Sequence, residues 1–131
     1  MTKPDSPLRG LALAAGAFGL LTIGSGGNAL FGGAAARQAA GAYVPFVLWF
    51  NFLAGFGYVL AAAGLWLGRR WATQLAWAIA LATLLVFAAF GVHVARGGAY
   101  EVRTVAAMTL RSVLWLAIAW FATRRLGRRS A

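Results

Sequence analysis

The chain has 131 residues, of which 62% are hydrophobic and 11% charged, and its mean hydropathy is +0.76. Soluble domains carry about 25% charged residues, so this composition argues against a soluble enzyme, a disordered tail or a nucleic-acid-binding arm. Twelve lysines and arginines against two acids give a net charge of +10, and the absence of cysteine excludes disulfides and thiolate metal sites. We interpret residues 1–131 as a single integral membrane domain.

Four long apolar runs follow an N-terminal segment that contains Pro4 and Pro7. They cover about residues 10–31, 43–67, 71–94 and 102–123. Each run exceeds 20 residues, which is enough to cross a hydrocarbon core of about 30 Å at about 1.5 Å per residue. Lipid cannot satisfy open backbone groups, so the runs must be helices, and the short connections make neighbours antiparallel. The sequence predicts an all-α fold, a four-helix transmembrane bundle with up-down-up-down order.

The first run permits a second interpretation. Lys3 and Arg9 precede the apolar stretch 11–23, and the small residues 34–36 follow, an order typical of a secretory signal peptide. We expect a retained helix instead, because the apolar run continues past Ile23 and is long enough to span a membrane.

The distribution of basic residues predicts the orientation. One side would hold eight of them: Lys3, Arg9, Arg69, Arg70, Arg124, Arg125, Arg128 and Arg129. The other side would hold three: Arg37, Arg96 and Arg103. Cytoplasmic loops carry the excess of Lys and Arg, so we expect both termini in the cytoplasm and the protein in a bacterial-type inner membrane.

Arg111 belongs to neither side. It lies nine residues into the fourth run, about 13 Å from the outer end of that helix, where an arginine costs about 2.5–3.5 kcal/mol on insertion scales. Asp5 belongs to the opposite side, and Glu101 is ten residues away along the same helix, so neither acid is an obvious partner. The candidate partners are neutral dipoles, water, a lipid phosphate, an anionic ligand, or an acid on another subunit.

Neutral polar residues occur at a similar depth on the other helices. Asn51 lies at nearly the same depth as Arg111 and on the same helix face as Tyr58. Thr104 precedes Arg111 by seven residues, so the two lie on one face of the fourth helix. These positions predict a polar pocket in the outer half of the bundle, whereas the inner half is almost entirely apolar. The residues expected to bind a ligand or partner are Arg111, Asn51, Tyr58, Thr104, Ser25, Asn28, His93, Glu101 and Arg103.

Catalytic motifs are absent, and one histidine with two acids is too few for a triad or an ordinary metal site, so we expect no catalytic residue, cofactor or metal. For His93 a capped or solvated side chain is the first interpretation; a proton-linked role and haem ligation with Met108 are the alternatives. Glu101 and Arg103 belong either to a salt-bridged lid or to an ordinary solvated turn.

Two glycine-rich patterns resemble the small four-helix DoxX-like membrane proteins. They are Gly27-Asn-Ala-Leu-Phe-Gly32 at the end of the first run and Leu53-Ala-Gly-Phe-Gly57 through Gly64-Leu-Trp-Leu-Gly-Arg-Arg70 in the second. The resemblance covers about the first half of the chain. It implies a bundle and an accessory role, since some members resemble subunits of quinone-linked oxidoreductases. The basic residue usual near the end of helix one in that family is replaced here by Asn28 and Ala29.

Three functions are compatible with these observations. The first is a non-enzymatic accessory or interaction subunit of a membrane complex, in which a partner supplies the acid that Arg111 lacks. The second is a homodimeric carrier or channel for a small anion. The third is a lipid- or quinone-binding protein that uses Asn51, Tyr58 and Arg111 with Trp49 and Trp115. The expected partners are the lipid bilayer and a membrane protein or second copy of the chain, and not nucleic acid.

Overall fold

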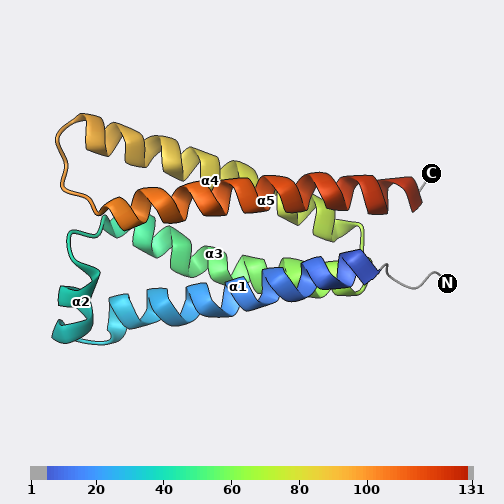
Figure 1. Cartoon of the computed structure of the whole chain (residues 1–131), viewed down its shortest axis with the longest axis horizontal. Coiled ribbons are helices and arrows are strands. Elements are labelled where there is room, and N and C mark those ends of the chain that lie inside the picture. Colours follow the sequence, from blue (N-terminus) through green and yellow to red (C-terminus); the bar gives the residue numbers. More distant parts are fainter. Residues whose placement is uncertain (1–5, 130–131) are drawn as a thin grey trace.

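A computed structural model describes residues 6–129 and contains one short and four long helices. The helices are α1 (Ser6–Phe31), α2 (Ala34–Ala40), α3 (Pro45–Trp66), α4 (Trp71–Ala95) and α5 (Val102–Arg129). The four long helices are each long and apolar enough to cross a membrane. They run antiparallel to their chain neighbours, so both ends of the described chain lie at the same end of the bundle, and α2 lies at the opposite end (Figure 1). This arrangement confirms the predicted all-α four-helix bundle.

Two helix limits and one element differ from the expectation. α1 begins at Ser6 and α5 continues to Arg129, because hydropathy marks where a membrane span ends and a helix rich in arginine extends beyond it. The short α2 was not predicted, since its seven residues, five of them alanine, show no apolar periodicity. Lys3, Asp5 and the expected irregular N-terminal segment lie outside the described residues.

Glycine contacts bring α1 and α3 together along most of their length. A Cβ atom at Gly55 would lie 2.7 Å from Ile23 Cγ1 and 3.2 Å from the Gly19 carbonyl oxygen. A Cβ at Gly19 would in turn lie 3.0 Å from the Gly55 carbonyl oxygen. Because lipid provides no hydrophobic driving force between helices, small residues that permit such close backbone approach are a main source of packing energy.

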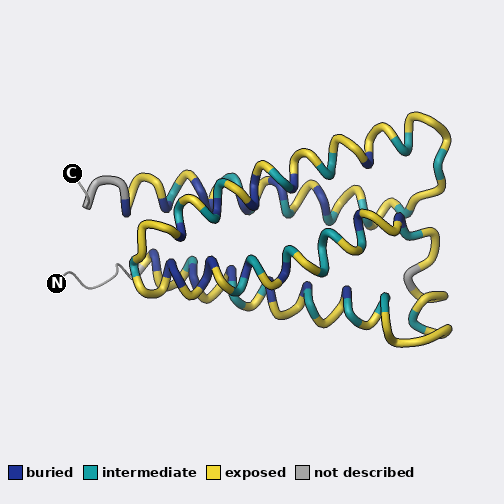
Figure 2. The backbone as a smooth tube through the Cα atoms, turned by 180° about the vertical axis from the view of Figure 1, so that it is seen from behind, coloured by how far each residue is buried: buried dark blue, intermediate teal, exposed yellow. Residues whose placement is uncertain are grey.

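Burial is uneven along the bundle axis. The main core lies in the half that contains the two chain ends, which we call the terminal end, and Figure 2 shows the buried segments concentrated there. Its largest fully buried side chains are Trp115, Tyr58, Leu8, Leu65 and Ile118. A smaller cluster of Val44, Val47, Phe90 and Met108 lies toward the α2 end.

The α1–α3 and α4–α5 pairs meet chiefly through α3 and α4, whereas α1 and α5 touch only sparsely. The bundle is therefore loosely packed between α1 and α5.

Candidate functional site

Arg111 extends from α5 toward α1 and α3. Its Nη1 donates a hydrogen bond of 3.0 Å to Thr22 Oγ1 and a longer one of 3.4 Å to the hydroxyl of Tyr58. The guanidinium also lies over the Phe18 ring, with Cζ 5.0 Å from the ring centroid. A cation over an aromatic face gains about 0.5–2 kcal/mol, more where water is excluded. Two hydroxyls and an aromatic ring thus compensate part of the cost of this partly buried charge.

Aromatic stacking fixes the position of these groups. The Tyr58 ring is fully buried and stacks on Phe18 at 5.6 Å and on Trp115 at 4.8 Å between centroids. Trp115 is one helical turn beyond Arg111 on α5, so the three rings form a layer beneath the guanidinium. This layer separates Arg111 from the apolar core of the terminal end.

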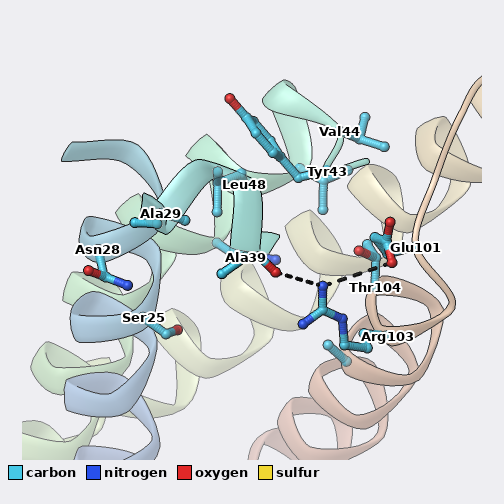
Figure 3. A pocket seen from close by; sticks show the side chains of 14 residues that line it. Ser25, Asn28, Ala29, Ala39, Tyr43, Val44, Leu48, Glu101, Arg103 and Thr104 are labelled. Carbon is cyan, nitrogen blue, oxygen red and sulfur yellow. Dashed lines mark hydrogen bonds and ion pairs between the residues drawn. The ribbon is translucent and has the colours of Figure 1, made fainter. Parts of the chain in front are cut away.

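A cavity of about 350 Å³ lies on the other side of Arg111, between α1, α3 and α5. Figure 3 shows α2 over it and, around it, polar side chains from α1, from α5 and from the loops before α3 and α5. Its polar and tyrosine lining residues are Ser25, Asn28, Tyr43, Asn51, Glu101, Arg103 and Thr104. Ala107 also lines it, and Arg111 is the next residue of α5 on the same face, one turn deeper. The cavity and the Arg111 cluster are therefore adjacent along the bundle axis.

Three polar atoms at this site have no hydrogen-bond partner within the described part of the chain. They are Asn51 Oδ1 in the cavity wall, and Arg111 Nε and Trp115 Nε1 beneath it, and all three are buried. An unsatisfied buried acceptor or donor costs about 1–3 kcal/mol, and more when the group is charged. The site therefore holds one acceptor and two donors, one of them charged, that water molecules or polar ligand groups would satisfy.

The rim of the cavity is closed by a contact between two loops. Glu101 Oε2 accepts a hydrogen bond of 2.8 Å from the backbone N–H of Ala42, and Glu101 Oε1 lies 3.9 Å from Arg103 Nη2. Arg103 also donates a hydrogen bond of 3.2 Å to the Ala39 carbonyl of α2 (Figure 3). Gly41 has φ +71°, and a Cβ there would lie 2.7 Å from Glu101 Oε2, so glycine is required for this approach. Glu101 and Arg103 together hold the α2 segment over the cavity.

His93 is separate from the other expected site residues. Its Nε2 lies 2.9 Å from the Ala99 carbonyl oxygen, which it meets as a hydrogen-bond donor, and its ring packs against Phe46 and Phe90. Met108 is fully buried in the neighbouring cluster with Val44, Val47 and Phe90. The geometry at His93 corresponds to a capped side chain at the end of α4.

The structure thus divides the nine expected site residues into three groups. Six line the cavity: Ser25, Asn28, Asn51, Glu101, Arg103 and Thr104. Arg111 and Tyr58 form the hydrogen-bonded pair beneath it, and His93 lies apart. Within the described residues, Arg111 forms no hydrogen bond with Asn51 and is bound by Thr22 instead.

Sequence reasoning placed Thr22 among the outer-half polar residues but not in the site, and it missed Phe18. Thr22 and Phe18 are four residues apart on α1, and this helical spacing was the available signal for a shared face. Trp49, which the third function assigns to the ligand site, is 44% exposed and meets Phe31 and Phe52 edge-on, on the outer surface of α3. Periodicity places Trp49 two residues from Asn51, about 200° around the helix, so the two cannot share a face.

The electrostatics favour a negatively charged or acceptor-rich occupant. Among the described residues Glu101 is the only acid, and its carboxylate is bound at the rim to Ala42 and Arg103. The positive charge of Arg111 is consequently balanced by dipoles and rings rather than by a carboxylate. No cluster of three or more potential metal ligands occurs in the described part of the chain.

Comparisons with protein-family models, curated proteins and solved structures give no match to this chain. The resemblance to the DoxX-like proteins stays a prediction from sequence patterns. What the four apolar helices establish is that the chain is a small multi-pass membrane protein.

Proposed function

We propose that this chain is a small non-enzymatic membrane protein that binds the polar head of a lipid-soluble amphiphile, of the lipid or quinone class. The head group would occupy the cavity between α1, α3 and α5. The observation that carries the proposal is Arg111: a cation that has no carboxylate partner among the described residues, and whose Nε is buried and unsatisfied beneath that cavity. Phosphate oxygens and quinone carbonyls are both acceptors suited to a guanidinium and a carboxamide.

The route of access supports an amphiphile rather than a soluble ion. α1 and α5 touch only sparsely, and the cavity is lined by residues of both helices, such as Ser25 and Thr104. A molecule with its tail in the leaflet can therefore present its head between these helices without crossing the loops. The tail would lie along exposed apolar side chains such as Leu21 and Leu110, which are 71% and 57% exposed.

The ring layer beneath Arg111 argues against the anion-carrier alternative. Tyr58 and Trp115 are fully buried and stacked, and the cluster of buried side chains beneath them is apolar. An ion that reaches Arg111 would meet this layer, not a hydrated path. Binding without passage is what the packing supports.

Identification of the retained molecule tests the proposal. The protein is extracted in a mild detergent and analysed intact by native mass spectrometry, followed by lipid extraction. We expect one retained amphiphile, lost or strongly reduced in Arg111→Gln. The matched control is Arg96→Gln, which also removes one positive charge at this end of the bundle. Arg96 lines a different cavity.

Two results would replace the proposal with an alternative. A stable heteromer whose formation depends on Arg111, with no retained small molecule, would favour the accessory subunit, in which a partner's acid pairs with Arg111. Anion uptake by liposomes that contain the purified protein would favour the carrier. We also propose an inner-membrane location with cytoplasmic termini, on the basis of the basic residues at the terminal end.

A further inference from the structure

A second cavity, of about 400 Å³, lies at the terminal end, on the far side of the core from the first. The described residues that line it come from the loop before α4, from α4 and from α5: Arg70, Thr73, Gln74, Thr123 and Leu126. None of them belongs to the α2-end cavity or contacts Arg111. We propose that this cavity binds the phosphate group of an anionic phospholipid from the leaflet at the terminal end.

The hydroxyl of Thr73 is the first argument, because its oxygen is buried and has no hydrogen-bond partner among the described residues. Four other helical hydroxyls each donate a hydrogen bond of 2.7–2.8 Å to the carbonyl four residues earlier: Thr83, Thr109, Ser112 and Thr123. Thr73 is the third residue of α4, so the carbonyl four residues earlier belongs to Arg69, before the helix. Its buried Oγ1 has no partner in the described chain. The Thr73 hydroxyl in the cavity wall is therefore a donor without an acceptor among the described residues.

The wall opposite Thr73 is rigid. Thr123 Oγ1 accepts a hydrogen bond of 2.8 Å from Trp77 Nε1 and donates one to the Ala119 carbonyl, so its hydroxyl is fully used. The Trp77–Thr123 bond fixes α4 against α5 beside the cavity. Leu126, only 2% exposed, supplies an apolar surface next to the polar groups. A preformed cleft loses little conformational entropy when it is occupied.

Charge selects an anion. Arg70 lines the cavity, and neither its side chain nor that of Gln74 forms a hydrogen bond or ion pair with the described residues. Arg69 precedes it, and Arg124 and Arg125 lie above the rings of Trp120 and Phe121 on α5. Glu101, the only acid among the described residues, lies at the opposite end of the bundle. Guanidinium, hydroxyl and carboxamide donors around one space are the groups that bind phosphate oxygens.

The setting favours a lipid as the source of that phosphate. Trp71 and Trp120 are 42% and 55% exposed near this end, as expected for tryptophans at the level of the lipid head groups. Basic pockets between transmembrane helices, close to this interface, bind anionic head groups. A diacyl tail would extend from the cavity along the outer faces of α4 and α5, where Leu81 and Val113 are 55% and 61% exposed.

The experiment compares lipid binding to the intact protein by native mass spectrometry, titrating phosphatidylglycerol or phosphatidylcholine into the delipidated protein in detergent. We expect tighter binding of phosphatidylglycerol, weakened about tenfold by Arg70→Gln, as for the loss of one charge-assisted contact. Thr73→Val, which is isosteric, should weaken it about threefold to tenfold. Circular dichroism and the melting temperature confirm that each variant is folded.

Matched controls separate this cavity from general surface charge. Arg69→Gln removes the same charge from the neighbouring residue, which does not line the cavity, and Thr109→Val removes a hydroxyl bonded within its own helix. Both should bind phosphatidylglycerol as the unmodified chain does. Equal loss in Arg69→Gln and Arg70→Gln, or equal affinity for the two lipids, would overturn the proposal.

Two further arms identify the source and separate the two cavities. Inorganic phosphate at millimolar concentration should not displace the lipid; displacement would show a soluble anion as the occupant and overturn the lipid assignment. Arg111→Gln should leave the binding of phosphatidylglycerol to the Arg70 cavity unchanged, even if it reduces the amount of amphiphile retained in the first cavity. Loss of the same bound phosphatidylglycerol in Arg111→Gln and not in Arg70→Gln would place the phosphate at the other cavity, contradicting this proposal.

Discussion

The carboxylate of Glu101 accepts a hydrogen bond of 2.8 Å from the backbone N–H of Ala42, 59 residues earlier in the chain. This bond joins the loop before α5 to the loop before α3. Because Arg103 binds both Glu101 and the Ala39 carbonyl, the two loops and α2 form one connected rim over the first cavity.

Glu101→Gln should change the free energy of unfolding by less than about 1 kcal/mol, because glutamine keeps a carbonyl oxygen for Ala42 and a half-exposed ion pair contributes little. Glu101→Ala removes the acceptor and should cost about 1.5 kcal/mol. Denaturant unfolding in detergent micelles, followed by circular dichroism, measures both. Equal losses in the two variants would mean that the charge, and not the acceptor for Ala42, holds the rim.

Both termini should lie in the cytoplasm, because most basic residues flank the terminal end of the bundle. Reporters that are active on only one side of the membrane, fused to each terminus, measure this directly. A fusion at the loop near Arg96 is the internal control and should give the opposite signal. A periplasmic C-terminus would reverse the assignment of leaflets to the two cavities.

Arg111→Ala should impair ligand retention or assembly more than Arg103→Ala does. Arg111 is partly buried between hydroxyls and a ring, whereas the Arg103 side chain is 69% exposed and can remain hydrated. Arg111→Lys should not restore full function, because an ammonium cannot reproduce the planar fork of donors that meets Thr22 and Tyr58. Native mass spectrometry of the three variants checks the order. An Arg111→Ala protein that assembles and retains its ligand normally would remove Arg111 from the site.

Gly55→Ala should destabilise the α1–α3 pair by about 1–3 kcal/mol, the usual cost of overpacking a tight contact. Its new methyl group would lie 2.7 Å from Ile23 Cγ1 and 3.2 Å from backbone atoms of α1. Gly91→Ala is the matched control, since a Cβ there meets no atom within 4 Å. In thermal unfolding experiments in micelles, we expect a lower melting temperature for Gly55→Ala and an unchanged one for Gly91→Ala. An unchanged melting temperature for Gly55→Ala would show that α1 and α3 can separate without loss of stability.

The sequence was sufficient to predict the bundle and the position of Arg111 along its helix, because hydropathy and helical rise are local properties. It also indicated polar groups at one end, among them Asn51 and Thr104. It could not predict which of them would line a cavity, since that depends on how closely α1 approaches α5. The hydrogen bond between Ala42 and Glu101 could not be predicted either, because nearly every residue type supplies a backbone N–H and the sequence does not mark which one donates.

His93 illustrates the limit in another way. Its position near the end of α4 was predictable, but its partner is the Ala99 carbonyl, placed by the glycines of the following turn. A capped side chain was the first interpretation of His93, but its partner could be named only once the turn geometry was known.

The uneven packing along the bundle axis has a consequence for internal motion. The larger apolar core lies in the terminal half, whereas beside the first cavity α1 and α5 contact each other only sparsely. Local opening costs least where buried contacts are few and water can enter. Protection of backbone amides against deuterium exchange should thus be highest at Ile118 and its neighbours and lower in the residues of α1 and α5 that line the first cavity. Those parts of α1 and α5 would open locally while the core around Ile118 stays closed.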